Sequence, residues 1–257
     1  MSREDCYAAL TWVYEHQVQF SVDIERIAIM GDSAGGCLAA CASLLARDRG
    51  LFHRLAKQIL IYPMLDDRNT TPNLALEPLA PWKVADNITS WTTLLGNGNN
   101  HDPVSQYAAP ARSETVDGLQ SAYIEVEVGD LDIFRNESIQ YATVLAAADV
   151  GVEFHLYPGV PHLFDILAPA IHVTKRALEN RISELWKFLK HLYLAVGTVD
   201  YPVLLSILFR IIRAVHDPRP NGDLERMLKV PGKHLFITDE TWRSEPEREL
   251  AERKFKG

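Results

Sequence analysis

Cysteine is scarce in this chain: the three present are Cys6, Cys37 and Cys41. An odd, sparse set does not make a disulfide framework, and the C-x-x-C pairs that bind structural metals are missing from the sequence. Cys37 and Cys41 are four residues apart, which places them on one face of a helix as small buried packing residues. The cysteine content therefore predicts neither a disulfide-stabilised protein nor a metal site.

Long hydrophobic runs and an excess of positive charge are missing too. The most apolar stretch, residues 202–215, is too short to span a bilayer and contains Arg210 and Arg213. The amino terminus, M-S-R-E-D-C-Y, lacks the apolar core of a signal peptide. A net charge of −8 disfavours binding to nucleic acid or to anionic membranes. We therefore expect a cytoplasmic protein with no integral membrane segment and no nucleic-acid partner.

The 257 residues do contain an alternation of helix and strand patterns. This order predicts right-handed βαβ units and an α/β fold, with a mostly parallel sheet of about four strands and flanking helices. The expected helices are 5–19, 34–48, 88–95, 136–148 and 168–193, and the expected strands are 26–30, 58–62, 122–128 and 152–157.

The pattern changes near residue 195, so we expect a domain over residues 1–194 and a mostly helical or irregular extension over residues 195–257. The extension contains an apolar helical pattern at 202–215, then the break D-P-R-P-N-G-D, and a strand-like run at 234–238. A segment of this length buries little core by itself.

The motif G-D-S-A-G, residues 31–35, stands between an expected strand and an expected helix. This context is typical of a nucleophile elbow, in which small flanking residues allow a sharp turn that exposes the serine oxygen above the sheet edge. The motif predicts Ser33 as a nucleophile. The backbone N–H of Ala34, at the helix start, would then face an oxyanion that forms beside Ser33. A chance glycine-rich turn is the alternative, which the strand-to-helix context disfavours.

Candidates for the base and the acid follow the third and fourth strands. A serine hydroxyl needs a general base, and in this architecture the chain order is serine, acid, histidine. His162 lies in the loop after the fourth strand, whereas the other histidines fall on predicted helices, on their ends or within a strand. Asp132 follows the third strand and is the expected partner of His162, with Asp130 as the competing candidate.

Four segments carry a resemblance to a known family: D-I-E-R-I-A-I-M-G-D-S-A-G-G-C-L-A-A, Y-P-M-L-D-D-R, Y-I-E-V-E-V-G-D-L-D-I-F-R-N-E and H-L-Y-P-G-V-P-H-L-F-D. Over residues 5–194 the chain resembles the hormone-sensitive-lipase-like branch of the α/β-hydrolases, also called α/β-hydrolase fold-3. The resemblance implies that Ser33 is the nucleophile, Asp132 the acid and His162 the base. It also implies hydrolysis of carboxylic esters, commonly with short acyl groups, without a cofactor.

The chain departs from the family pattern in several places. No H-G-G stretch is present, although the family has an H-G-G-G oxyanion loop upstream of the serine. Leu163 replaces the glycine of H-G-F, and Asn136 replaces the acid of R-D-E. The strand before Asp132 has two more residues than the family pattern. Side chains of a strand alternate between its two faces with period two, so two extra residues leave the faces of the following side chains unchanged. We therefore expect the C-terminal portion of an α/β-hydrolase fold, with an exposed sheet edge through which chains could self-associate.

Three hypotheses follow. The first is a serine hydrolase of the carboxylesterase type that acts on a small-molecule ester through an acyl-enzyme, with activity weakened by the missing oxyanion loop. The second is a non-catalytic ligand-binding or interaction protein on a degraded hydrolase scaffold, which the retention of His162 disfavours. The third is an incomplete product of a longer gene.

Overall fold

The computed structural model describes residues 3–20, 22–51, 55–96, 104–119, 122–123 and 128–196. Its first compact unit comprises Met1–Gln17 and Val22–Ala195, and the second comprises Val18–Ser21 and Val196–Gly257. Nearly all of the second unit lies outside the described residues, and so do the helix predicted at 202–215 and the elements predicted beyond it. The account below concerns the first unit, together with the described residues at the ends of α2 and α7 that belong to the second.

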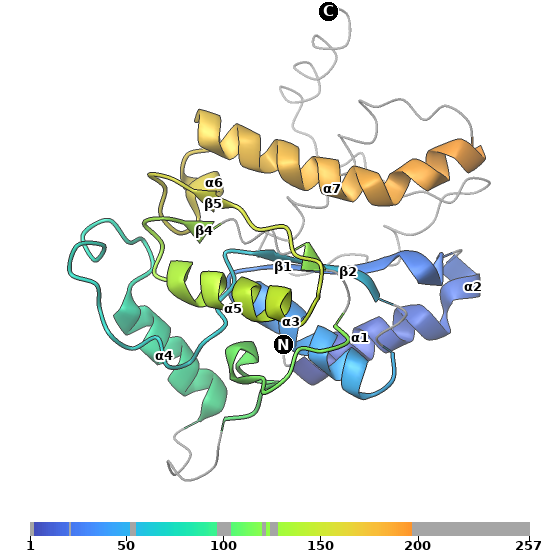
Figure 1. The fold of residues 1–257 in the computed structure, drawn as a ribbon, viewed down its shortest axis with the longest axis horizontal. Helices are drawn as coiled ribbons and strands as arrows, with labels where there is room; N and C mark the ends of the chain where they lie inside the picture. Colours follow the sequence, from blue (N-terminus) through green and yellow to red (C-terminus); the bar gives the residue numbers. More distant parts are fainter. Residues whose placement is uncertain are drawn as a thin grey trace, which may run out of the picture. The chain divides into compact units, whose positions relative to one another are not determined.

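Helices and strands alternate along most of this unit (Figure 1). The helices are α1 (Arg3–Glu15), α2 (Gln17–Phe20), α3 (Ala34–Asp48), α4 (Val84–Leu95), α5 (Arg135–Ala147), α6 (Phe164–Leu167) and α7 (His172–Val196), with 3-10 turns at Ile24–Arg26 and Pro110–Arg112. The strands are β1 (Ile27–Asp32), β2 (Leu55–Ile61), β3 (Ala122–Tyr123), β4 (Val128–Gly129) and β5 (Leu156–Tyr157). None of the described helices is both long enough and apolar enough to span a lipid bilayer.

All of the described strand pairs are parallel, as the sequence pattern predicts. β1, β2 and β3 form one sheet in that order, and β4 pairs with β5 in a second. Of the strand predicted at 122–128, the described residues Ala122, Tyr123 and Val128 are in strands, and residues 124–127 lie outside the described residues. The strand predicted at 152–157 is too long, because β5 has only its last two residues. Apolar alternation marks residues that suit a strand, whereas a strand also needs a paired neighbour along its length.

Helices cover both faces of the β1–β2 region (Figure 1). α3 packs against β1 and β2 on one side, and α5 lies on that side too, next to β4. α7 lies on the other side, where Glu184 forms an ion pair with Lys57 of β2. The middle of α3 is almost entirely buried, and Cys37 and Cys41 lie in this core at 4% and 1% exposure. The prediction that these cysteines are packing residues is confirmed, and the Cys41 hydrogen bond and burial raise the pKa of the Cys37 thiol.

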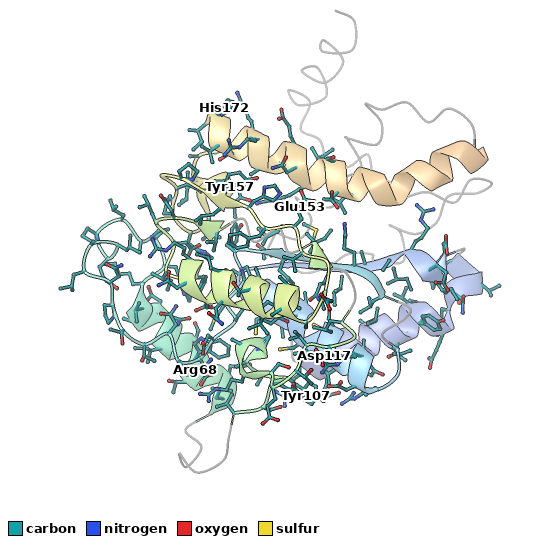
Figure 2. All side chains as sticks on the ribbon, viewed as in Figure 1. Arg68, Tyr107, Asp117, Glu153, Tyr157 and His172 are labelled. Carbon is teal, nitrogen blue, oxygen red and sulfur yellow. The ribbon has the colours of Figure 1, made fainter. Side chains whose placement is uncertain are left out.

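The segment 104–119 is attached to the C-terminal end of α3. Figure 2 labels two residues of this segment, Tyr107 and Asp117. The Tyr107 hydroxyl donates to Asp48 Oδ2 at 2.7 Å, and Arg47 Nη1 donates to the carbonyl of Asp117 at 3.2 Å. These side chains share one polar cluster, in which Arg47 also pairs with Asp48 at 2.7 Å. The excursion between β2 and β3 is therefore anchored on the helix that follows Ser33.

The long helix predicted at 168–193 begins later than expected. Ala168 has φ −137° and ψ 65°, which are not helical values, and α7 starts at His172. Ala168 precedes Pro169, and a proline ring disfavours the helical conformation of the residue before it. The proline thus separates the short α6, directly after His162, from α7.

Candidate active site

Ser33 occupies a strained turn between β1 and α3. Its φ of 52° and ψ of −119° are unusual for a residue with a side chain, and such strain persists only where surrounding contacts enforce it. Three backbone hydrogen bonds do so: the Ser33 N–H donates to Ile61 O at 2.9 Å, and its carbonyl accepts from Met64 N at 3.0 Å and Cys37 N at 3.2 Å. The backbone of Ser33 is therefore fixed by β2, by the segment after β2 and by α3.

Glycine is required at position 31 because the turn is so tight. A Cβ atom on Gly31 would lie 2.1 Å from the carbonyl oxygen of Gly35, which is rigid backbone. A Cβ on Gly36 would lie 2.7 Å from Cβ of Pro63, whereas one on Gly35 would meet only Asp32 Oδ1 at 3.5 Å. The glycines of the motif thus differ: Gly31 and Gly36 allow close approach, and Gly35 does not need to be glycine for steric reasons.

We therefore predict that Gly31→Ala is severely destabilising and that Gly35→Ala is not. The first substitution forces the turn apart and should lower the free energy of unfolding by about 3 kcal/mol or more. The second removes a flexible residue from the first turn of α3 and should be neutral or slightly stabilising. Urea denaturation followed by circular dichroism measures both, and equal stability of the two variants would contradict this account of the turn.

The structure brings Ser33, His162 and Asp132 together in one hydrogen-bonded series. Ser33 Oγ lies 3.0 Å from His162 Nε2, and His162 Nδ1 lies 2.7 Å from Asp132 Oδ2. The second oxygen of Asp132 accepts the N–H of Phe134 at 2.9 Å. His162 and Asp132 are 2% and 1% exposed. When Nδ1–H donates to the carboxylate, the Nε2 lone pair faces the serine hydroxyl, which is the arrangement that general-base catalysis requires.

The loops that carry Asp132 and His162 are joined by the parallel pair β4–β5. The N–H of Asp130 donates to Tyr157 O at 2.9 Å, and that of Leu131 donates to Val160 O at 3.3 Å. The two loops approach so closely that a Cβ on Gly129 would lie 1.8 Å from Val160 O. Backbone pairing thus sets the distance between the carboxylate and the imidazole.

Asp130, the competing acid, faces a different partner. Its Oδ1 accepts the N–H of Gly159 at 2.7 Å and so supports the turn before His162. Of the two aspartates, Asp132 is the one that the structure places against the imidazole.

Aromatic rings enclose the His162 imidazole, and sequence reasoning did not identify them. Tyr62 and Phe134 meet it edge-on, with ring centroids 4.8 Å and 5.0 Å away. The Tyr62 hydroxyl donates to Asp165 Oδ1 at 3.0 Å, and Arg181 Nη1 donates to Asp165 Oδ2 at 2.7 Å. Burial and the Asp165 carboxylate raise the pKa of Tyr62, so its hydroxyl remains a donor. The signal available in the sequence was the tyrosine directly after β2.

Two further positions predicted from the sequence lie beside the series. Ala34 is the first residue of α3, so its backbone N–H is one of those at the helix N-terminus. Leu163 adopts φ 59° and ψ 24°, a left-handed conformation that costs a residue with Cβ about 1–2 kcal/mol. The resemblance identified glycine as usual at this position, and this backbone explains the preference.

The arrangement contains the parts needed for acyl transfer by a serine. It has a serine hydroxyl, an imidazole in contact with it, a carboxylate that contacts the imidazole, and a helix N-terminus beside the serine. Within the described ranges, no group of three or more histidine, cysteine or acidic side chains is placed to bind a metal ion.

Comparison with known proteins identifies relatives that are named as hydrolases. The family model described as alpha/beta hydrolase fold matches residues 1–166. Esterase LipI of Mycobacterium tuberculosis is 36% identical over 180 residues, which are 68% of this chain and 55% of LipI. Carboxylesterase NlhH of Mycobacterium tuberculosis is 32% identical over 173 residues, which are 65% of this chain and 53% of NlhH.

Solved structures that resemble this chain also include esterases. A bacterial heroin esterase has 40% sequence identity and a TM-score of 0.63, covering 69% of this chain and 56% of its own. The esterase LipW from Mycobacterium marinum has 31% identity and a TM-score of 0.59, covering 68% of this chain and 53% of its own. The chain spans about half the length of the curated relatives it matches.

Proposed function

Because the chain belongs to the alpha/beta hydrolase fold family, we propose that it is a serine hydrolase that cleaves carboxylic esters through an acyl-enzyme. One observation carries the proposal: the hydrogen-bonded series Ser33–His162–Asp132, with distances of 3.0 and 2.7 Å. Relatives named esterase or carboxylesterase support it. The resemblance to the α/β-hydrolase fold-3 branch is confirmed by the same comparisons.

In the proposed reaction, Ser33 Oγ attacks the ester carbonyl carbon while His162 Nε2 takes the hydroxyl proton. Asp132 stabilises the imidazolium that forms, and the N–H of Ala34 donates to the oxyanion of the tetrahedral intermediate. Collapse of the intermediate breaks the bond to the leaving alcohol, which receives the proton from His162. Water, deprotonated by His162, then attacks the acyl carbon of the acyl-enzyme. The bond from this carbon to Ser33 Oγ breaks, His162 returns the proton to Ser33, and the carboxylic acid is released.

We expect turnover by this chain to be slow. The sequence has no H-G-G stretch, and Ala34 is the only oxyanion donor that we assign. Loss of a single donor of this kind lowers kcat by about 10²- to 10³-fold. The hydrolase proposal thus predicts formation of a covalent serine adduct together with slow ester turnover.

The finer predictions from the sequence also remain proposals. They are a small-molecule ester as substrate, a cytoplasmic location, and self-association through an exposed sheet edge. β1 stands at one end of the described three-strand order, and its Met30 side chain is 40% exposed. Sedimentation at increasing protein concentration tests the self-association, and a monomer at all concentrations would contradict it.

An active-site probe tests the proposed function directly. The 257-residue chain is incubated with a fluorophosphonate, and the modified peptide is identified by mass spectrometry. We expect one label per folded chain, on Ser33, and slow hydrolysis of short p-nitrophenyl esters. A folded chain that takes no label at Ser33 would refute the proposal, and ligand binding by such a chain would favour the non-catalytic alternative.

A further inference from the structure

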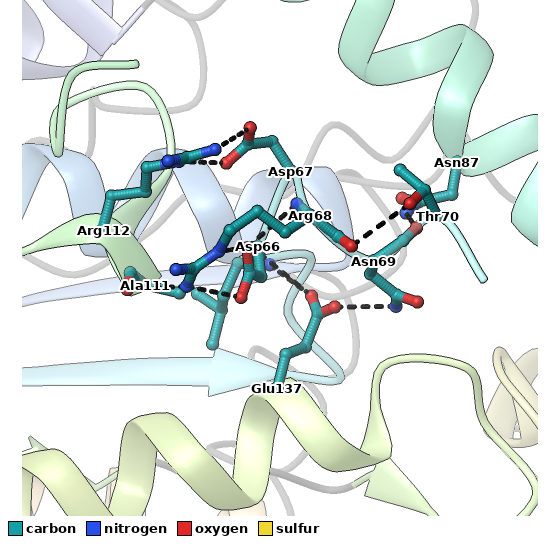
Figure 3. Close-up of polar contacts among 10 residues, drawn as sticks. Asp66, Asp67, Arg68, Asn69, Thr70, Asn87, Ala111, Arg112 and Glu137 are labelled. Carbon is teal, nitrogen blue, oxygen red and sulfur yellow. Dashed lines mark hydrogen bonds and ion pairs between the residues drawn. The ribbon is translucent and has the colours of Figure 1, made fainter. Parts of the chain in front are cut away.

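One buried carboxylate, that of Glu137, lies outside the series formed by Ser33, His162 and Asp132. Glu137 lies in the first turn of α5 and is only 7% exposed. Its Oε1 accepts the backbone N–H groups of Leu65 at 2.6 Å and Asp66 at 3.3 Å, and its Oε2 accepts Asn69 Nδ2 at 2.8 Å (Figure 3). A buried polar group is retained at little cost only when it is hydrogen-bonded in this way. Glu137 therefore binds the segment that follows β2.

That segment contacts the nucleophile. The N–H of Met64, one residue before Leu65, donates to the carbonyl of Ser33 at 3.0 Å. Pro63, one residue earlier, is the residue against which Gly36 packs in the first turn of α3. By fixing the N–H groups of Leu65 and Asp66, Glu137 also fixes the chain that supports the strained turn at Ser33.

The same network reaches the loop that carries the acid. Asn69 Nδ2 donates to the carbonyl of Ile133 at 3.0 Å as well as to Glu137. Ile133 directly follows Asp132, and Phe134 supplies the N–H that Asp132 accepts. Asn69 and Glu137 thus connect the support of Ser33 to the support of Asp132.

We propose that Glu137 is a positioning residue for the catalytic series, with Asn69 as the partner through which it acts on the acid loop. This inference rests on the proposed function, since it assigns Glu137 a part in the same reaction. Glu137 has no direct contact with the reacting atoms in this role. It acts by holding two backbone segments, both of which contact members of the series, at a fixed separation.

The charges around Glu137 are consistent with a geometric role. Arg68 pairs with Asp66 and Arg112 pairs with Asp67, so both guanidinium groups are directed at other carboxylates (Figure 3). Burial raises the pKa of Glu137 to about 8, with the nearby Asp66 carboxylate acting in the same direction and the three N–H donors acting against it. Glutamine, which is neutral and of similar shape, therefore tests the hydrogen bonds of this side chain rather than its charge.

Glu137→Gln distinguishes the hydrogen bonds to the segment after β2 from the hydrogen bond to Asn69. A glutamine oxygen can still accept the N–H groups of Leu65 and Asp66, which preserves the larger part of the packing. Its amide nitrogen would face the donating Nδ2 of Asn69, so the link to the acid loop is lost. Asn69→Ala removes the same link from the other side. Asn136→Ala, which changes the exposed neighbour of Glu137 on α5, is the matched control.

The measured quantity is the rate constant for labelling of Ser33 by a fluorophosphonate, per folded molecule. We expect Glu137→Gln and Asn69→Ala each to slow labelling about 10- to 100-fold, because small displacements of reacting groups have effects of that size. The double variant should be no slower than either single variant, since both remove one link. Asn136→Ala should label at the rate of the unaltered chain. Labelling per folded molecule that is unchanged in Glu137→Gln would overturn the positioning role and leave a structural one.

Failure of the proposed function would be recognised separately, because the unaltered chain would then take no label. The positioning role is in that case decided by the low-field proton resonance of the His162 Nδ1–H, which reports the hydrogen bond to Asp132 without any reaction. We expect this resonance to shift or broaden in Glu137→Gln and Asn69→Ala and to stay unchanged in Asn136→Ala. An identical resonance in all four proteins would overturn the proposal.

Discussion

Replacing Ser33 with alanine should abolish phosphonate labelling and lower ester hydrolysis by about 10⁴-fold or more. The expected size follows from the geometry: Ser33 Oγ is the atom that faces the base, 3.0 Å from His162 Nε2. Without the hydroxyl, His162 has no nucleophile to activate and no covalent intermediate can form. Mass spectrometry of the labelled protein and hydrolysis of p-nitrophenyl acetate give two independent measurements.

Ser43→Ala is the control for this experiment. Ser43 lies on the same helix, α3, and is buried, and its hydroxyl donates to the carbonyl of Ala39 at 2.9 Å. Its removal should leave labelling at the level of the unaltered chain. If Ser33→Ala were labelled as fully as Ser43→Ala, another nucleophile would be responsible and the assignment of Ser33 would be wrong.

Replacing Asp132 with asparagine should lower kcat about 10³- to 10⁴-fold while the fold is retained. The side chain keeps its shape, so Phe134 N can still donate to its oxygen. The amide nitrogen, however, would face His162 Nδ1, which favours the tautomer with hydrogen on Nε2. That tautomer presents a donor to Ser33 Oγ and cannot take its proton. Activity, together with a thermal melt to verify folding, measures the effect.

Asp130→Asn provides the comparison that the sequence left open. The Asp130 carboxylate accepts Gly159 N at 2.7 Å, and an asparagine oxygen can accept the same bond. We expect activity close to that of the unaltered chain. A large loss in Asp130→Asn together with a small one in Asp132→Asn would reverse the assignment of the acid.

Local patterns predicted the elements around the nucleophile well. The helix predicted at 34–48 is α3 at the same bounds, and the strand predicted at 26–30 lies within one or two residues of β1. These elements depend on side-chain periodicity and on small residues at a sharp turn, both of which are legible in a short stretch of sequence. Pro169 also indicates the late start of α7, which helical periodicity alone does not predict.

Long-range contacts were less predictable. Tyr62 and Glu137 each resemble an ordinary residue at the end of a strand or in the first turn of a helix. Their importance comes from contacts with residues more than sixty positions away, namely Asp165 for Tyr62 and Leu65 for Glu137. Periodicity reports which face of an element is buried, but it does not report which side chain of another element meets that face.

Local sequence patterns were enough to predict the α/β class, the turn that displays Ser33 and the two loops in which an acid and a base could stand. Which of Asp132 and Asp130 contacts His162 depends on the tertiary structure, because both follow the same strand and the pairing of β4 with β5 sets which carboxylate meets the imidazole. The tertiary structure also decided the burial of Glu137, since burial depends on the segment after β2 that folds over it. The distances that chemistry needs, of about 3 Å, arise between residues far apart in the chain and therefore belong to the fold.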